Sequence, residues 1–455
     1  RDDRCPLARA ADCRSALPAN LADQSSASLN MTQRRAIDQY LAHYALLPMG
    51  CPELEGEWRH VMVLPCFDED PLFIHRFAQS FKTASLLLIL VINRPVSSTP
   101  EANQAVKTAL AALPSHPLQL GFNLHEVNPS FSILSIDLEA LEGATPCNQG
   151  VGRARRVGCD VALTLIDRET VSSPWIYSTD ADTEWDASLL SRTWPSEASA
   201  VSLPFTHRAT EDPALSHATL IYELTMHHYV LHLQAIGSPY AFHTLGSSCV
   251  IHSHAYAAVR GMPLRNAAED FYLLNKLAKV GPVHCARGAG VRITSRQSNR
   301  VPFGTGPAVR RLLEAKDLCE VPLFYHADCF AVLRQFLQLF WHWSNEPETD
   351  TQAQLTEHLG TAVGADLQRL LTQWGYQKAL RHIHQAGRSD AARRQHIHTW
   401  FDGFKLLKVI HLLRDHHFPS LTLNEAMRSP EQWPVIHTGT PSGLRDAIYT
   451  HLGWS

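Results

Sequence analysis

The sequence has no apolar run long enough to span a bilayer and no excess of basic residues. Its longest purely aliphatic stretch, Leu86 to Ile92, is far shorter than the roughly 20 residues of a membrane helix. Lys and Arg number 40 against 44 Asp and Glu, and this net charge of -4 provides no basic field for a polyanion. We therefore expect no transmembrane segment and no nucleic-acid partner, while peripheral contact with a membrane surface stays open.

The ten cysteines form no Cys-x-x-Cys pair, which argues against a zinc ribbon and a dithiol redox motif. Residues 1–30 are polar and alanine-rich, with no charged-then-apolar signal peptide, and the first amphipathic pattern follows Met31. We expect reduced thiols in a cytoplasmic protein and a disordered extension over residues 1–30.

From Trp58 onward, short apolar runs alternate with helical patterns, which is typical of an α/β domain with a mostly parallel central sheet. The patterns predict strands at 61–65, 86–92, 175–178, 200–203 and 247–251, and helices at 71–81, 100–113, 150–166, 213–236 and 267–280. After about residue 307 the periodicity is helical, without convincing strands. We expect an α/β domain over residues 31–306 and a helical C-terminal domain over residues 307–455.

Two acidic residues follow the predicted strand 175–178, in the sequence Asp180-Ala181-Asp182. Open α/β sheets bind ligands outside the carboxyl ends of their strands. Carboxylates there suit Mg²⁺ or Mn²⁺, which can bridge a diphosphate. A solvated turn or a helix cap is the alternative interpretation.

A second acidic pair, Glu269 and Asp270, begins the predicted helix 267–280. Acidic residues suit a helix N-terminus for electrostatic reasons alone, so capping is one interpretation. The other is that a carboxylate accepts a proton from an attacking hydroxyl.

Two basic segments have the composition to bind a diphosphate, because guanidinium groups form paired hydrogen bonds with phosphate oxygens. One is the helical stretch Gly152 to Gly158, with Arg155 and Arg156, and the other runs from Ser295 to Arg300. Exposed helix faces and surface turns have similar compositions.

These segments, in this order, resemble the family 2 glycosyltransferases of the GT-A fold over roughly residues 58–306. The matching segments are Pro65-Cys-Phe67-Asp-Glu69, Ala154-Arg-Arg-Val-Gly158, Asp180-Ala-Asp182, Glu269-Asp270 and Gln297-Ser-Asn-Arg300. The chain departs from the family where Asn93-Arg94-Pro95 replaces an acidic turn, and where Arg156 and Val301 replace an asparagine and a tryptophan.

The resemblance implies transfer of a sugar from a nucleoside-diphosphate donor, a UDP- or GDP-sugar, to an unidentified hydroxyl acceptor. It implies a divalent metal ion held by Asp180 and Asp182, with Asp270, next to Glu269, as the catalytic base of an inverting displacement. The implied donor-binding residues are Pro65, Phe67, Glu69, Asn93, Arg155, Arg156, Asp180, Gln297 and Arg300. The alternatives are a sugar nucleotidyltransferase and a non-catalytic module that binds sugar nucleotides or glycans.

Overall fold

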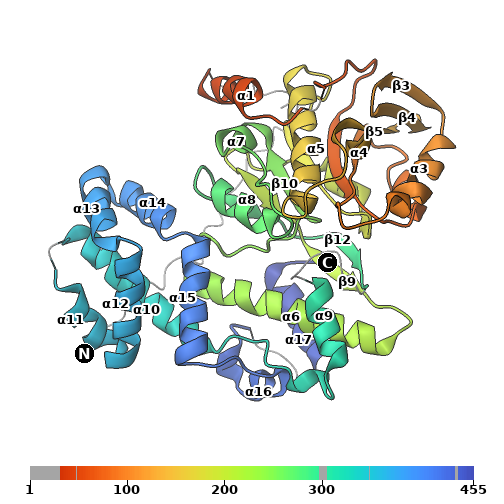
Figure 1. Cartoon of the computed structure of the whole chain (residues 1–455). Coiled ribbons are helices and arrows are strands. Elements are labelled where there is room, and N and C mark those ends of the chain that lie inside the picture. The colour runs from red at the N-terminus through yellow and green to blue at the C-terminus, as the bar shows by residue number, and fades with distance from the viewer. Residues whose placement is uncertain (1–30, 48, 297–304, 348, 436–438) are drawn as a thin grey trace, which may run out of the picture.

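The computed structural model describes residues 31–47, 49–296, 305–347, 349–435 and 439–455 (Figure 1). An α/β part and a helical part lie side by side, and the chain passes from the first to the second near α9. The expected disordered extension over residues 1–30 lies outside the described residues, as do Gln297 and Arg300.

Among the described residues, nine strands form one mixed sheet in the order β11-β8-β10-β6-β1-β2-β5-β4-β3. The four inner strands β6, β1, β2 and β5 run parallel, whereas β10 is antiparallel to both β6 and β8, and β3 and β4 are antiparallel to their neighbours. The strands are β1 (His60–Cys66), β2 (Leu86–Ile92), β3 (Ser115–Gln119), β4 (Phe122–Asn128), β5 (Phe131–Asp137), β6 (Trp175–Ser178), β8 (Ala200–Ser202), β10 (Cys249–His252) and β11 (Val283–Cys285). The α/β class is confirmed, but the sheet is mixed, with parallel pairing in its centre and between the edge strand β11 and β8.

Each face of this sheet has its own core, because successive residues of a strand point to opposite sides. Val61 and Val63 of β1 pack on one face with α1, α5, α7 and α8, whereas Met62 and Leu64 pack on the other with α2 and α3. The helices are α1 (Met31–His43), α2 (Leu72–Ser80), α3 (Gln104–Ala111), α4 (Leu138–Glu142), α5 (Gly150–Asp167), α7 (Ser253–Ala258) and α8 (Glu269–Leu277). A second sheet of β7 (Thr183–Trp185), β12 (Val291–Thr294) and β9 (Phe205–Arg208) packs on the same face as α2.

The predicted helical C-terminal region is confirmed. Its helices are α9 (Thr305–Glu314), α10 (Ala327–Asn345), α11 (Thr351–Leu359), α12 (Thr361–Gln373), α13 (Tyr376–Ala386), α14 (Asp390–Trp400), α15 (Gly403–His416), α16 (Leu423–Arg428) and α17 (Pro441–Leu452). Helix α6 (Pro213–Ala235) comes earlier in the chain but packs against α9, α10 and α17. It therefore contributes to the apolar core of the helical part. In the described part of the chain, no helix has the length and apolar character needed to cross a membrane.

Candidate active site

Three neighbouring parallel strands in the centre of the sheet have their carboxyl ends side by side. Strands β2, β1 and β6 are consecutive neighbours, and the segments after them contain Asn93, Glu69 and the pair Asp180 and Asp182. The carboxyl ends of parallel strands are where open α/β sheets bind ligands. The carboxylates that follow β1 and β6 therefore lie at the strand ends where a binding site is expected.

Arg155 of α5 connects two of the predicted site residues. Its Nη1 atom donates to Glu269 Oε1 over 3.0 Å, and its Nη2 atom donates to Asp180 Oδ1. The Arg155 side chain is only 4% exposed, and a buried charge of this kind requires paired and hydrogen-bonded partners. The segment after β6 and the first turn of α8 therefore meet at one guanidinium group.

Gly246 allows this guanidinium to lie where it does. A Cβ atom at position 246 would be 1.4 Å from Arg155 Nη1 and 2.4 Å from Arg155 Cζ. The backbone N–H of Gly246 also donates to Asp270 Oδ2 over 2.8 Å. Gly246 thus contacts both the Arg155 guanidinium and the Asp270 carboxylate. No pattern in the sequence indicates this role.

Glu269 and Asp270 form the first turn of α8, but neither is its N-cap. The N-cap residue is Ala268, which has a positive φ of 57° and makes no side-chain capping bond. Besides the N–H of Gly246, the Asp270 carboxylate accepts the N–H of Phe271 over 2.7 Å, and this bond satisfies one free donor of the helix end. The two carboxylates are therefore oriented both by the helix end and by groups outside it.

The environment of these two acids raises the pKa of both. Burial has the largest effect and raises the pKa of Glu269 to about 7, while the charge of Arg155 lowers it and that of Asp270 raises it. Burial also raises the pKa of Asp270, against the lowering effect of Arg155 and of two backbone N–H groups. Perturbed carboxyl pKa values of this kind are typical of acid–base sites, although structural ion pairs produce them too.

A second arginine, Arg296, connects the segments after β1 and β6. Its Nε atom lies 2.7 Å from Asp182 Oδ2, and its Nη1 and Nη2 atoms donate to the two oxygens of Glu69 over 3.0 and 3.3 Å. Burial raises the pKa of Asp182 to about 6, with Arg296 lowering it and the carboxylates of Asp180 and Glu69 raising it. The predicted basic segment 295–300 contains Arg296, although the sequence pointed to Gln297 and Arg300 instead.

The segments after β1 and β2 are held together by Asn103, which sequence analysis did not identify. Its side-chain Nδ2 donates to the carbonyl of Asn93 over 3.0 Å, and its Oδ1 accepts the N–H of Asp68 over 3.0 Å. Asp68 has a positive φ of 52°, a left-handed conformation that few residues other than glycine adopt without cost.

Two of the predicted donor-binding residues belong to β1 or follow it. Pro65 is buried inside β1, and Phe67, directly after that strand, is half-buried.

The structure does not bring Arg156 to these residues. Its Nη1 donates to the carbonyl of Met262 over 3.0 Å and its Nη2 to that of Tyr44 over 2.7 Å. Consecutive residues of an α-helix point about 100° apart, so Arg155 and Arg156 cannot both face the strand ends. Arg156 instead connects α5 to the segments after α1 and α7.

The fit of a divalent metal ion depends on Asp180 and Asp182. No cluster of three or more His, Cys, Asp or Glu side chains in the described residues has the geometry to hold a metal, so a site made entirely of such protein ligands is not formed there. Mg²⁺ at phosphate-binding sites usually takes one or two carboxylates and completes its shell with phosphate oxygens and water. The two aspartates fit this kind of site, provided that they exchange their arginine partners for the ion.

Comparison of the chain with known proteins adds no assignment: neither a protein-family model nor a curated protein matches it.

Proposed function

We propose that the protein is a glycosyltransferase of the GT-A type that moves a sugar from a nucleoside-diphosphate donor to a hydroxyl acceptor. The observation that carries the proposal is the pair of bonds made by Arg155. They join Asp180, which follows β6, to Glu269, which directly precedes the candidate base Asp270. A strand-end carboxylate and a helix-start acid pair, far apart in the sequence, therefore lie around a single cation.

The donor would bind across the ends of β1, β2 and β6. Its diphosphate would lie near Arg155 and Arg296, whose guanidiniums can replace a carboxylate partner with phosphate oxygens. Asp180 and Asp182 would hold the divalent cation, which offsets negative charge on the departing diphosphate. The nucleoside would lie on the β1 side, near Glu69, as the resemblance to family 2 implies.

Asp270 would accept the proton of the acceptor hydroxyl as that hydroxyl attacks the anomeric carbon. The N–H groups of Gly246 and Phe271 fix the orientation of its carboxylate. Its raised pKa makes the ionised carboxylate of Asp270 a stronger base than that of an ordinary aspartate. Direct attack on the side opposite the leaving group would invert the anomeric configuration.

The experiment is to incubate the protein with a panel of UDP- and GDP-sugars and Mn²⁺, with and without added pyrophosphate, and to measure release of the nucleoside diphosphate and formation of the nucleoside triphosphate. Nucleoside diphosphate release supports a glycosyltransferase. A sugar nucleotidyltransferase instead consumes the added pyrophosphate and forms UTP or GTP with the sugar 1-phosphate, and a binding module forms neither nucleotide. Either of these two results would contradict the proposal.

The variant Asp270→Asn tests the base with a matched control. Asparagine keeps the size of the side chain but cannot take up the proton, so we expect turnover to fall by roughly 100-fold or more with donor affinity nearly unchanged. Asp328→Asn is the control, because Asp328 occupies the same second position of its helix, α10, and is exposed. If Asp270→Asn keeps a rate within a few-fold of the parent, Asp270 is not the base.

A further inference from the structure

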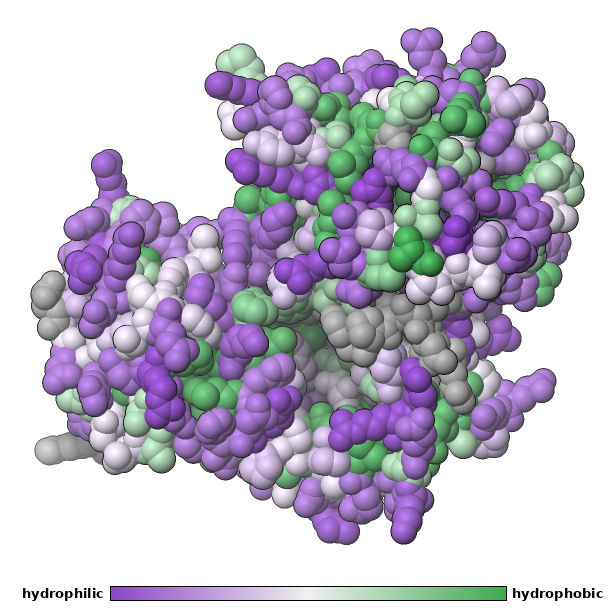
Figure 2. Space-filling view, viewed as in Figure 1, coloured by the Kyte–Doolittle hydropathy of each residue, from purple (hydrophilic) through white to green (hydrophobic). Residues whose placement is uncertain are grey.

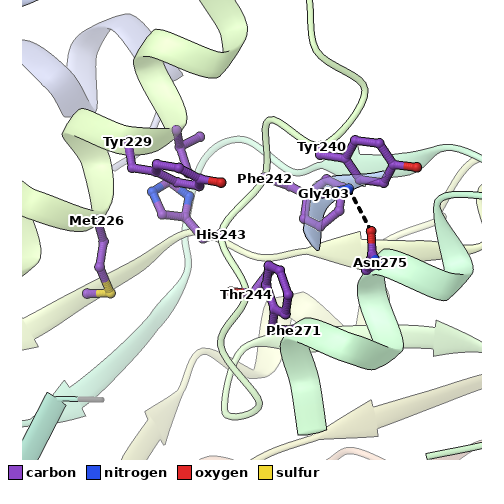
Figure 3. A pocket seen from close by; sticks show the side chains of 10 residues that line it. Met226, Tyr229, Tyr240, Phe242, His243, Thr244, Phe271, Asn275 and Gly403 are labelled. Carbon is purple, nitrogen blue, oxygen red and sulfur yellow. Dashed lines mark hydrogen bonds between the residues drawn. The ribbon is translucent and has the colours of Figure 1, made fainter. Parts of the chain in front are cut away.

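A small cavity lies where the α/β part meets the helical part. Its volume is about 100 Å³, and its walls come from α6, from the segment between α6 and β10, from α8 and from the first residue of α15 (Figure 3). Figure 2 shows a hollow between the two parts of the molecule, with apolar side chains inside it. The lining residues are mostly aromatic or aliphatic: Met226, Tyr229, Val230, Tyr240, Phe242, His243, Thr244, Phe271, Asn275 and Gly403.

The cavity is next to the candidate base. Phe271, which lines it, directly follows Asp270 in α8, and its own N–H binds the Asp270 carboxylate. Thr244, another lining residue, lies two positions before Gly246, whose N–H binds the same carboxylate. A group that occupies the cavity would therefore lie close to the hydroxyl from which Asp270 takes the proton.

The walls are suited to an apolar ring. Tyr229, Tyr240, Phe242 and Phe271 surround the space in Figure 3, and aromatic side chains prefer edge-to-face or offset contacts with other rings. A volume of about 100 Å³ is several times the roughly 10–15 Å³ that one water molecule occupies on this measure. The space is thus larger than a packing defect that a single water would fill.

Two hydrogen bonds hold these walls in place. Tyr240 donates to the carbonyl of His398 over 2.6 Å, and the N–H of Gly403 donates to Asn275 Oδ1 over 2.9 Å. The Tyr229 hydroxyl points into the space, and no group in the described part of the chain forms a hydrogen bond with it. A tyrosine hydroxyl can donate one hydrogen bond, so a polar atom on a bound molecule could accept from it here.

We propose that the cavity receives an aromatic ring of the acceptor, so that the acceptor is a hydroxyl compound bearing an aryl group. This proposal depends on the proposed function, because it places that ring beside the hydroxyl that Asp270 deprotonates. The ring would contact the aromatic walls, and a polar substituent or ring oxygen beside it would accept the hydroxyl of Tyr229.

The test compares two probes that differ only in the ring, phenyl β-glucoside and methyl β-glucoside. Binding of each is measured by NMR titration, and transfer onto each is measured with whichever nucleotide sugar the protein consumes. Burial of a phenyl ring predicts binding and transfer about ten- to a hundredfold stronger for the phenyl glucoside. Equal binding and equal transfer of the two probes would overturn the proposal, and the cavity would then be a gap in packing.

Variants locate the binding. Met226→Trp fills the cavity and Tyr229→Leu removes one aromatic wall, so each should reduce the preference for the phenyl glucoside at least fivefold. Phe404→Ala is the matched control, because Phe404 follows Gly403 in α15 but does not line the cavity. A preference that survives both cavity variants in a protein that still melts cooperatively would show that the ring binds elsewhere, and would overturn the proposal.

The two proposals fail in different ways. Release of nucleoside diphosphate without any preference for the phenyl glucoside leaves the glycosyltransferase standing and rejects the aryl acceptor. No release from any nucleotide sugar rejects the glycosyltransferase and, with it, the role of the cavity in acceptor binding, even if the phenyl glucoside binds.

Discussion

Gly246→Ala should damage the candidate site through Arg155. The new Cβ would lie 1.4 Å from Arg155 Nη1, so the guanidinium would have to move. Gly246 has no positive φ, so alanine fits the backbone, and the expected loss comes from the displaced side chain. Displacement breaks the bonds to Glu269 and Asp180 and leaves buried charges without partners.

The expected magnitude follows from those two bonds. A hydrogen bond to a charged group contributes about 1.5–3 kcal/mol, and removing one partner of a buried ion pair costs about 3–5 kcal/mol. We expect the free energy of unfolding of the α/β part to fall by about 3 kcal/mol or more, with a melting temperature lower by on the order of 6–12 °C. Urea denaturation and thermal melting measure both.

A double-mutant cycle with Arg155→Met identifies the cause. If alanine acts only by displacing the Arg155 guanidinium, adding Gly246→Ala to Arg155→Met should change stability by less than about 0.5 kcal/mol. Losses that add in full would refute the reasoning, and so would a single Gly246→Ala variant as stable as the parent.

Three further predictions concern the site and the core behind it. Asp182→Asn should reduce donor affinity at least tenfold in Mn²⁺ and much less without metal, because the amide is a poor ligand for the ion and a weaker partner for Arg296. Calorimetry measures both affinities, and an Asp182→Asn variant that binds the donor in Mn²⁺ as tightly as the parent would reject the metal site. The pKa of Asp270 is raised, and the base acts when it is ionised, so the transfer rate should fall as the pH decreases through a value above the ordinary aspartate pKa of about 3.9. A pH–rate profile that is flat down to pH 4 would contradict this prediction. Tyr256→Phe should lower the free energy of unfolding by about 1.5–3 kcal/mol in urea, because the Tyr256 hydroxyl donates to the buried carboxylate of Asp160 over 2.7 Å; an unchanged midpoint would show that this bond contributes nothing.

Strands buried on both faces could be predicted from the sequence because they are continuously apolar. Strands β1 and β2 are buried along their full length, and each lies within one residue of its predicted bounds. The stretch after α3 gave no such signal. It forms β3, β4 and β5, but Ser115, His116 and Pro117 are exposed and β4 carries polar residues among its apolar ones. The mixed character of the sheet was missed partly for this reason and partly because no local pattern gives the direction of β10, a predicted strand that runs antiparallel to β6 and β8.

The residues of the site could be predicted only where their position next to a predicted strand or helix indicates them. Asp180, Asp182, Glu269 and Asp270 lie directly after a strand or at the start of a helix, positions that a single sequence can identify. Contacts between distant segments have no such local pattern. Helical periodicity could not decide which of two consecutive arginines faces the strand ends, and nothing near Gly246 indicates that its missing side chain makes room for a guanidinium group.

The charges around the strand ends bear on what can bind there. Two guanidiniums are surrounded by more carboxylates than they can neutralise, and these charges come from Arg155, Arg296, Glu69, Asp180, Asp182, Glu269 and Asp270. A diphosphate that entered alone would meet an excess of negative charge, which raises the free energy of binding. A divalent cation at the two aspartates would release their arginines toward the phosphates and reduce that excess at the same time. Donor and cation should therefore bind cooperatively, each raising the affinity of the other by the same factor.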